Sequence, residues 1–133
     1  MKVLVADQIS EKGVQFLHQQ EHIEVVCNPD LPPAQLKENL KDAKGLIVRS
    51  KTQVNQDILD SAPDLRVIGR AGAGVDNIDL DTATKRGVLV MNTPGGNSVS
   101  AAEHAFALMI AIARKIPIAD ASMRSGKWDK PRF

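Results

Sequence analysis

The chain has 133 residues, of which 43% are hydrophobic and 25% are charged. That length suffices for one compact domain with a hydrophobic core and is short for two. The net charge is only +1, so no global positive field attracts nucleic acid or an anionic membrane. Aromatic residues make up 3% of the chain, which leaves few stacking surfaces for bases. We therefore expect neither a nucleic-acid partner nor a membrane partner.

The apolar runs and the single cysteine indicate where the protein works. The N-terminal run ends at Asp7 and is too short for the core of a signal peptide, and the longest run, 105–113, is too short to span a bilayer. Cys27 has no partner for an internal disulfide, and its place in the apolar run 23–27 predicts a buried, reduced thiol. These features predict a soluble, cytoplasmic protein.

Short apolar runs rich in β-branched residues alternate with segments of helical spacing. The runs are 2–6, 23–27, 46–48, 67–69 and 88–91. Strands that alternate with helices predict parallel crossovers and a sheet covered on both faces. The expected fold class is α/β, with a flavodoxin-like, doubly wound, five-stranded parallel sheet. Pro33 suits a first helical turn, while Asn55 and Asp79 are typical helix N-caps.

The C-terminal part has a different pattern. Ser100 and Glu103 have the spacing of a capping box, which predicts a helix from there to about Ile116. Its apolar residues point to every side, so it needs burial against a further surface. Pro117 predicts the first turn of another helix and Gly126 its end. We expect one domain over 1–97, and a crossover helix with an exposed tail over 98–133.

Two arginines follow predicted strands at the edge where ligands bind in such folds. In a doubly wound sheet the ligand crevice lies beyond the carboxyl ends of the strands. Arg49 follows the third strand, and Arg70 follows the fourth and precedes Ala71-Gly72-Ala73-Gly74. Backbone N–H groups of a glycine turn form an anion-binding nest that a neighbouring guanidinium can complete. The predicted ligand is a small anion.

The same turn is not a dinucleotide fingerprint. Asn77 stands where Gly-x-Gly-x-x-Gly requires its last glycine, and no ribose-binding acid follows in a suitable strand. Asp76 and Asn77 are instead interpreted as turn-forming residues whose side chains bond to local backbone. The three histidines, His18, His22 and His104, lack the spacing of metal ligands or of an acid–base pair, so neither a metal nor a catalytic role is assigned to them.

Three motifs in order resemble the D-isomer-specific 2-hydroxyacid dehydrogenases. They are Gly-Leu-Ile-Val-Arg-Ser (45–50), Gly-Arg-Ala-Gly-Ala-Gly-Val-Asp-Asn (69–77) and Met-Asn-Thr-Pro-Gly-Gly-Asn-Ser (91–98). The likeness covers the whole chain and is greatest to the members that oxidise 3-phosphoglycerate. It implies the substrate-binding portion of an NAD-dependent enzyme of serine biosynthesis. The family's nucleotide-binding domain and its catalytic arginine, carboxylate and histidine would follow Phe133, so we expect this chain alone to have no catalytic residues, to bind no NAD and to be inactive.

The resemblance also assigns roles to individual residues. Arg49 and Ser50 would bind the phosphate end of the substrate, with Lys51 a weaker candidate. Arg70 would recognise the anionic substrate, and N–H groups around Gly72 and Ala73 its carboxylate. The position of Ala73 is also a cofactor contact in the family. For Asn97 two interpretations stay open, a helix cap or a polar contact in the active site.

Two other functions deserve comparison. A self-associating anion-binding module without catalysis is favoured by the apolar helix, through which a homodimer would form. A receiver-like domain has the same topology, and would place an acidic pair after the first strand and a phosphorylatable aspartate after the third. Here those places hold Asp7 alone and Arg49, so the charges argue against it.

Overall fold

The computed structural model describes residues 1–133, which form two compact units, Met1–Pro94 and Gly95–Phe133. The first unit contains the sheet and the second contains only helices and a tail. Each unit has its own secondary structure and is described separately.

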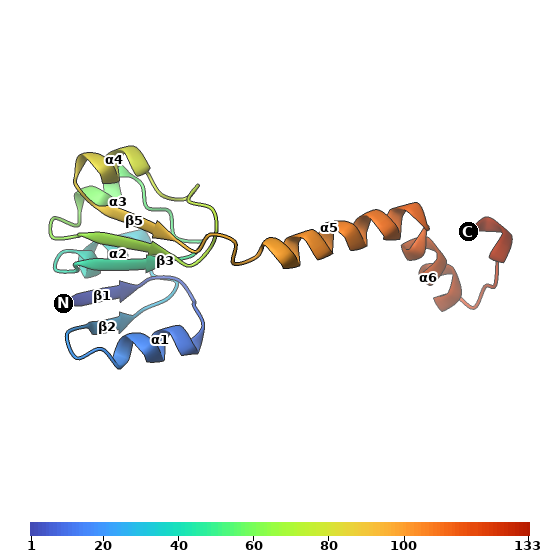
Figure 1. The fold of residues 1–133 in the computed structure, drawn as a ribbon, viewed down its shortest axis with the longest axis horizontal. Coiled ribbons are helices and arrows are strands. Elements are labelled where there is room, and N and C mark those ends of the chain that lie inside the picture. Colours follow the sequence, from blue (N-terminus) through green and yellow to red (C-terminus); the bar gives the residue numbers. More distant parts are fainter. The chain divides into compact units, whose positions relative to one another are not determined.

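The first unit is built on a five-stranded sheet (Figure 1). Its strands are β1 (Lys2–Val5), β2 (Glu24–Cys27), β3 (Gly45–Val48), β4 (Val67–Arg70) and β5 (Leu89–Asn92). They run parallel in the order β2-β1-β3-β4-β5. This is the flavodoxin order, so the predicted fold class is confirmed. All five carboxyl ends consequently meet at one edge of the sheet.

Four helices connect the strands, and their first residues follow from local chemistry. They are α1 (Glu11–His18), α2 (Pro33–Leu40), α3 (Gln56–Asp60) and α4 (Leu80–Lys85). Proline opens α2, where its missing N–H costs no hydrogen bond. The Asn55 side chain accepts from the N–H of Ile58, and that of Asp79 accepts from the N–H of Thr82. Both predicted N-caps are confirmed.

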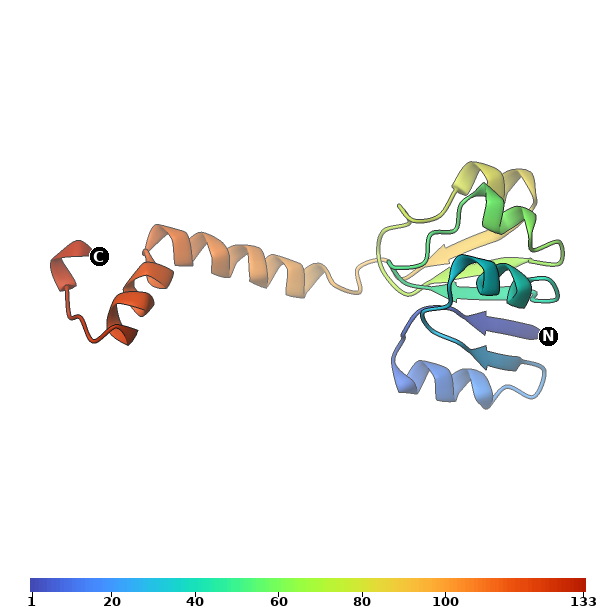
Figure 2. The same ribbon diagram turned by 180° about the vertical axis from the view of Figure 1, so that it is seen from behind.

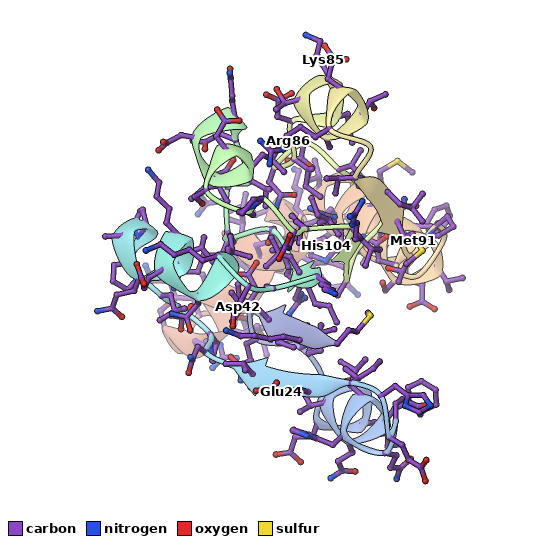
Figure 3. All side chains as sticks on the ribbon, turned by 90° about the vertical axis from the view of Figure 1, so that its left-hand side faces the viewer. Glu24, Asp42, Lys85, Arg86, Met91 and His104 are labelled. Atoms are coloured by element: carbon purple, nitrogen blue, oxygen red, sulfur yellow. The ribbon has the colours of Figure 1, made fainter.

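The helices divide unequally between the two faces of the sheet. The chain steps from β1 to the neighbouring strand β2 in one direction, then crosses back past β1 to β3 and continues through β4 to β5 in the other direction. Right-handed crossovers therefore place α1 on one face and α2, α3 and α4 on the other. Figure 2 shows α2 and α3 next to each other on their shared face, and Figure 3 shows α1 on the opposite side.

The hydrophobic core lies between the sheet and α2, α3 and α4. Most of its fully enclosed side chains come from alternate strand positions and from the inward faces of these helices: Leu4, Leu46, Val48 and Ile68 from strands, with Leu40 and Leu59 from helices. This alternation is what a strand with two different faces requires. Burying a leucine or isoleucine contributes about 1.5–3 kcal/mol, so this layer fixes the positions of the strand ends.

The other face is only partly covered. Leu89 is 60% and Met91 51% exposed, although Val90 between them packs against the core. Figure 3 shows Met91 on the side of the sheet opposite α2. Cys27 is exposed as well. Its predicted burial is wrong, because the thiol lies at the end of the edge strand β2 and not within the sheet.

The second unit contains α5 (Ser98–Ala113), α6 (Ile116–Arg124) and a short 3₁₀ helix, η1 (Lys130–Arg132). The predicted capping box is wrong: α5 begins at Ser98, and the Ser100 hydroxyl donates to the carbonyl of Asn97 within its first turn. Lys115, in the left-handed region at φ 53°, separates α5 from α6. As predicted, Pro117 lies in the first turn of α6, and Gly126, at φ 75°, follows the end of that helix.

Helix α5 exposes large apolar side chains on all sides. They are Val99, Phe106, Leu108, Met109, Ile110 and Ile112. Six such residues in one helix form an apolar surface far larger than isolated exposed residues would. None of the helices combines the length and apolar character that a membrane crossing requires.

Candidate anion-binding site

Two loops that carry arginines lie side by side at the carboxyl edge of the sheet. The register pairs Val48 with Arg70, and the N–H of Ala71 donates to the carbonyl of Val48 over 2.8 Å. The segment 49–52 after β3 and the segment 70–77 at the end of β4 therefore begin next to each other. The structure brings Arg49 and Arg70 to one edge, as the sequence predicted.

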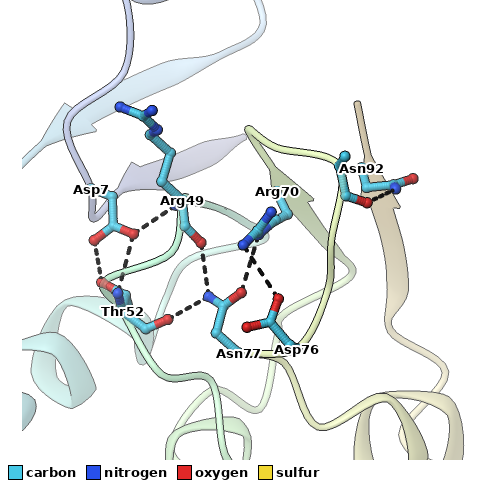
Figure 4. A network of polar contacts seen from close by, with 8 residues as sticks. Asp7, Arg49, Thr52, Arg70, Asp76, Asn77 and Asn92 are labelled. Atoms are coloured by element: carbon cyan, nitrogen blue, oxygen red, sulfur yellow. Dashed lines mark hydrogen bonds and ion pairs between the residues drawn. The ribbon is translucent and has the colours of Figure 1, made fainter. Parts of the chain in front are cut away.

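Asp7 anchors the first loop, residues 49–52, by accepting hydrogen bonds from the N–H groups of that loop. The residue lies just beyond the end of β1 and is 3% exposed. The carboxylate accepts from the N–H of Arg49 over 2.6 Å, from the N–H of Thr52 over 3.1 Å and from the Thr52 hydroxyl over 2.6 Å (Figure 4). Burial opposes ionisation, but the hydrogen bonds outweigh it and lower the pKa of Asp7 below its ordinary value.

Asn77 anchors the same loop by donating hydrogen bonds to the carbonyl groups of that loop. It is 4% exposed. Its amide nitrogen donates to the carbonyls of Arg49 over 2.8 Å and Thr52 over 2.7 Å, and its side-chain oxygen accepts from Nε of Arg70 over 3.1 Å (Figure 4). The predicted local bonding of Asn77 is wrong, because its partners lie in another loop and in a strand. One side chain thus connects both arginine-bearing segments.

The Arg70 guanidinium is mostly covered and packs against a glycine. The Arg70 side chain is 10% exposed. It forms one ion pair, in which Nη2 lies 3.5 Å from Oδ1 of Asp76, and the Asp76 side chain is 85% exposed. A Cβ on Gly72 would collide with Nη1 of Arg70. A side chain at this position would therefore displace the guanidinium from its present place. The prediction that the Asp76 side chain bonds to local backbone is also wrong, because this side chain contacts the Arg70 guanidinium.

The remaining residues of the first loop are exposed. Arg49 uses its backbone N–H and carbonyl in the network, and its side chain extends away from Arg70 in Figure 4. Ser50 and Lys51 form the tip of the loop. The Lys51 ammonium contacts Asp30 over 2.6 Å, with both side chains more than half exposed. Such a pair contributes about 0–1 kcal/mol, so an anionic ligand could compete for this lysine.

The second loop is also tied to β5. The Asn92 side chain donates to the carbonyl of Ala73 over 2.6 Å, and the N–H of Thr93 donates to the carbonyl of Gly72 over 3.0 Å. The backbone around Ala73 is thereby fixed on its carbonyl side. Asn97 belongs to the second unit, where it directly precedes α5 and forms no side-chain capping hydrogen bond.

Sequence reasoning missed the two buried polar residues, Asp7 and Asn77. The signal for Asp7 was an acid placed directly after four apolar residues, where its carboxylate meets neighbouring loops. For Asn77 the only local signal was a polar residue before Ile78, which is buried. Its role depends on a partner loop far away in the sequence, which one sequence does not display.

The glycine turn does not fit a dinucleotide. One side of Gly72 is covered by Arg70, and Asn77 is buried in the network. The helix that follows, α4, begins only at Leu80, and the carboxylate of Asp79 already caps its N-terminus. A pyrophosphate would meet a negative charge there. The three histidines are exposed, and no group of His, Cys, Asp and Glu side chains suited to a metal ion is present.

Comparison with known proteins places this chain in a family. Residues 3–123 match the model of the D-isomer specific 2-hydroxyacid dehydrogenase catalytic domain. The chain belongs to this family. Its carboxyl edge, with the two arginines, is thus part of a dehydrogenase fold, as the motifs in the sequence indicated.

Within the family, the chain is similar to D-3-phosphoglycerate dehydrogenases. It is 46% identical over 133 residues to that of Archaeoglobus fulgidus and 47% identical over 132 residues to that of Homo sapiens. These alignments cover 100% and 99% of this chain but only 25% of each relative. The chain therefore spans about a quarter of the length of the curated relatives it matches.

Solved structures are consistent with this family assignment. A protein of Thermus thermophilus superposes with a TM-score of 0.85 at 33% identity, over 97% of this chain and 42% of that one. A 3-phosphoglycerate dehydrogenase of Entamoeba histolytica with bound NAD⁺ superposes with a TM-score of 0.74 at 34% identity, over 84% of this chain and 38% of that one. The fold of the first unit is therefore one that occurs within larger enzymes.

Proposed function

We propose that this chain is the substrate-binding portion of an NAD-dependent D-3-phosphoglycerate dehydrogenase. The enzyme would oxidise 3-phosphoglycerate to 3-phosphohydroxypyruvate in the cytoplasm, at the entry to serine biosynthesis. The observation that carries this proposal is the buried Asn77, which holds Arg49 and Arg70 at one edge of the sheet. Similarity to curated D-3-phosphoglycerate dehydrogenases supports the choice of substrate.

The proposed substrate has two anionic ends, and the site offers two cationic segments. Arg49, with Ser50 and Lys51, would bind the phosphate, because a guanidinium supplies paired donors that remain charged. Arg70 would bind the carboxylate together with the N–H groups around Gly72 and Ala73. Nothing buried neutralises the Arg70 guanidinium, since Asp76 is a surface residue at 3.5 Å. A mostly covered cation without a buried counterion favours an arriving anion.

Two further contacts follow from the resemblance. We propose that Asn97 makes a polar contact to the substrate and that Ala73 touches the cofactor. NAD would accept the hydride in the intact enzyme. The residues of this chain bind and orient the substrate; the Asp7 carboxylate is occupied by three donors and is unsuited to accept a proton from it.

The role of the arginines can be measured by calorimetric titration of the 133-residue protein with 3-phosphoglycerate. We expect Arg49→Ala and Arg70→Ala each to weaken binding by about 1.5–3 kcal/mol, the contribution of a charge-assisted hydrogen bond. Arg66→Ala is the matched control: Arg66 is exposed, directly precedes β4 and lies at the opposite edge of the sheet from Arg70. Equal affinity for the wild type and both loop variants would refute the proposed site.

We also expect the 133-residue chain alone to produce no NADH from 3-phosphoglycerate and NAD⁺. The physical reason is that its glycine turn does not fit a dinucleotide and that the buried carboxylate of Asp7 is already occupied by three donors. The measurement is absorbance at the NADH band, with an intact relative as positive control. Turnover by the purified chain would contradict this part of the proposal.

The second candidate function, a self-associating anion-binding module, is favoured by the exposed apolar surface of α5. We expect light scattering at increasing concentration to reveal a homodimer. Ile112→Glu should shift the protein toward monomer, because Ile112 is 76% exposed and a charge there disfavours apolar contact. Gln35→Glu adds the same charge to the exposed surface of α2 and should leave the dimer unchanged. A monomer at all concentrations would eliminate this candidate.

A further inference from the structure

The first unit buries only two polar side chains, Asp7 and Asn77, and both lie at the anion-binding edge. Enclosing a polar group costs free energy unless every hydrogen bond is replaced. Both residues satisfy this condition: no buried side-chain nitrogen or oxygen lacks a partner. The rest of the core is apolar, so the buried polar bonds are concentrated where the ligand would bind.

The two residues divide the loop backbone between them. Asp7 accepts the N–H groups of Arg49 and Thr52, while Asn77 donates to the carbonyls of the same two residues. At both ends of the segment 49–52, the backbone N–H and the backbone carbonyl are therefore each hydrogen-bonded. A loop held at both ends loses little conformational entropy when a ligand binds.

Asn77 differs from Asp7 in a second respect, because it also holds Arg70. Its side-chain oxygen accepts from Nε, which leaves the two terminal nitrogens of the guanidinium without a buried partner. Fixing Nε restricts rotation of the planar group, and Gly72 supplies the space into which it packs. The orientation of the guanidinium is consequently set before any ligand arrives.

We propose that Asn77 is a positioning residue for anion recognition: it orients the Arg70 guanidinium and connects it to the Arg49 loop, so that both cationic segments are preorganised as one site. This rests on the proposed function, since it concerns the same anion. Asn77 itself touches no ligand. Its effect on binding passes mainly through the Nε–H bond to Arg70, and the bonds to the backbone of 49–52 make a smaller contribution.

The test is a double-mutant cycle on the affinity for 3-phosphoglycerate, with inorganic phosphate as a second probe. The variants are Asn77→Ser, Arg70→Ala and the double variant, each first checked for the wild-type circular dichroism spectrum. We expect Asn77→Ser to weaken 3-phosphoglycerate binding about tenfold, the size of one charge-assisted hydrogen bond. In the Arg70→Ala background the same substitution should change affinity by less than about twofold, because its main route of action is gone.

The outcomes separate the two proposals. If Arg70→Ala binds like the wild type, the proposed function fails, and the positioning role fails with it. If Arg70→Ala weakens binding but Asn77→Ser does not, or if the two effects add, then only the positioning role is overturned. Asn39→Ser is the matched control, because the Asn39 side chain bonds to the carbonyl of Gln35 within α2, away from the site.

A second measurement needs no variant and so does not depend on folding of Asn77→Ser. In the NMR spectrum of the wild-type protein, the Nε–H of Arg70 should exchange with water at least about tenfold more slowly than that of Arg66, whose side chain is exposed. Exchange at equal rates would show that the bond to Asn77 does not hold the guanidinium in solution, and would overturn the inference.

Discussion

Asn77→Asp should destabilise the first unit by about 3 kcal/mol and abolish most anion binding. The substitution preserves shape but replaces the amide nitrogen, which donates to two carbonyls, with an oxygen. That oxygen would face the carbonyls of Arg49 and Thr52 at the present 2.8 Å and 2.7 Å, acceptor against acceptors. Leaving buried groups unsatisfied costs about 1–3 kcal/mol, and more when charge is involved. The new negative charge would also occupy Arg70.

Thermal unfolding followed by circular dichroism measures the first effect. A loss of this size should lower the melting temperature by roughly 10–20 °C in a unit of this size. Asn39→Asp introduces the same change at a surface position on α2 and should alter the melting temperature by no more than about 2–3 °C, since surface substitutions usually stay within about 0.5 kcal/mol. If both variants have the same melting temperature, the network contributes nothing measurable to the stability of the fold.

Asp7→Asn should also destabilise the first unit, because it removes the negative charge of the buried acceptor that holds the loop 49–52. The carboxylate now accepts hydrogen bonds from two N–H groups and one hydroxyl. A carboxamide keeps one oxygen for the two N–H groups, and its NH₂ group can donate to the Thr52 hydroxyl, so the substitution mainly removes the charge that strengthens the two N–H bonds. We expect a loss of about 1–3 kcal/mol in the free energy of unfolding, determined from urea titration. Asp64→Asn, in an exposed turn, is the control; equal midpoints for the two variants would contradict the anchoring role of Asp7.

The Asp7 carboxylate should make the stability of the protein depend on pH, and the Asp7→Asn variant should lack this contribution. The pKa of Asp7 is lowered in the folded state, so its ionised form stabilises the protein above the unfolded-state value of about 3.9. That contribution is lost as the pH falls from there through the lowered folded-state pKa. Between about pH 5 and the acid unfolding limit, the wild type should therefore lose more stability than Asp7→Asn. Parallel curves would assign the acid sensitivity to other carboxylates.

Sequence patterns predicted the scaffold because the physical causes of strands and caps are local. Alternating apolar runs identified every strand to within about one or two residues, and the caps Asn55 and Asp79 depend only on the next turn. The start of α5 was missed because Ser100 has the capping spacing, yet the helical hydrogen bonds begin earlier, at Ser98. Cys27 was misplaced because an apolar run does not reveal that its strand is an edge.

The site was predictable only in part, for a related reason. The rule for carboxyl ends of strands brought Arg49 and Arg70 together without any knowledge of side-chain contacts. Asn77, by contrast, bonds to carbonyls at positions 49 and 52, and a backbone carbonyl is the same for every residue type. No sequence pattern distinguishes such an acceptor. The connection between the loops therefore emerges only from the folded chain.

The way the loop 49–52 is held has a consequence for how ligand choice could diverge. Its anchoring uses main-chain atoms of Arg49 and Thr52 and the Thr52 hydroxyl, whereas the side chains of Ser50 and Lys51 take no part in that network. Replacements at these two positions can alter charge and reach at the tip while the cost of folding stays nearly constant. Selectivity and stability are thus encoded by separate atoms of one short segment, and evolution can vary the first without eroding the second.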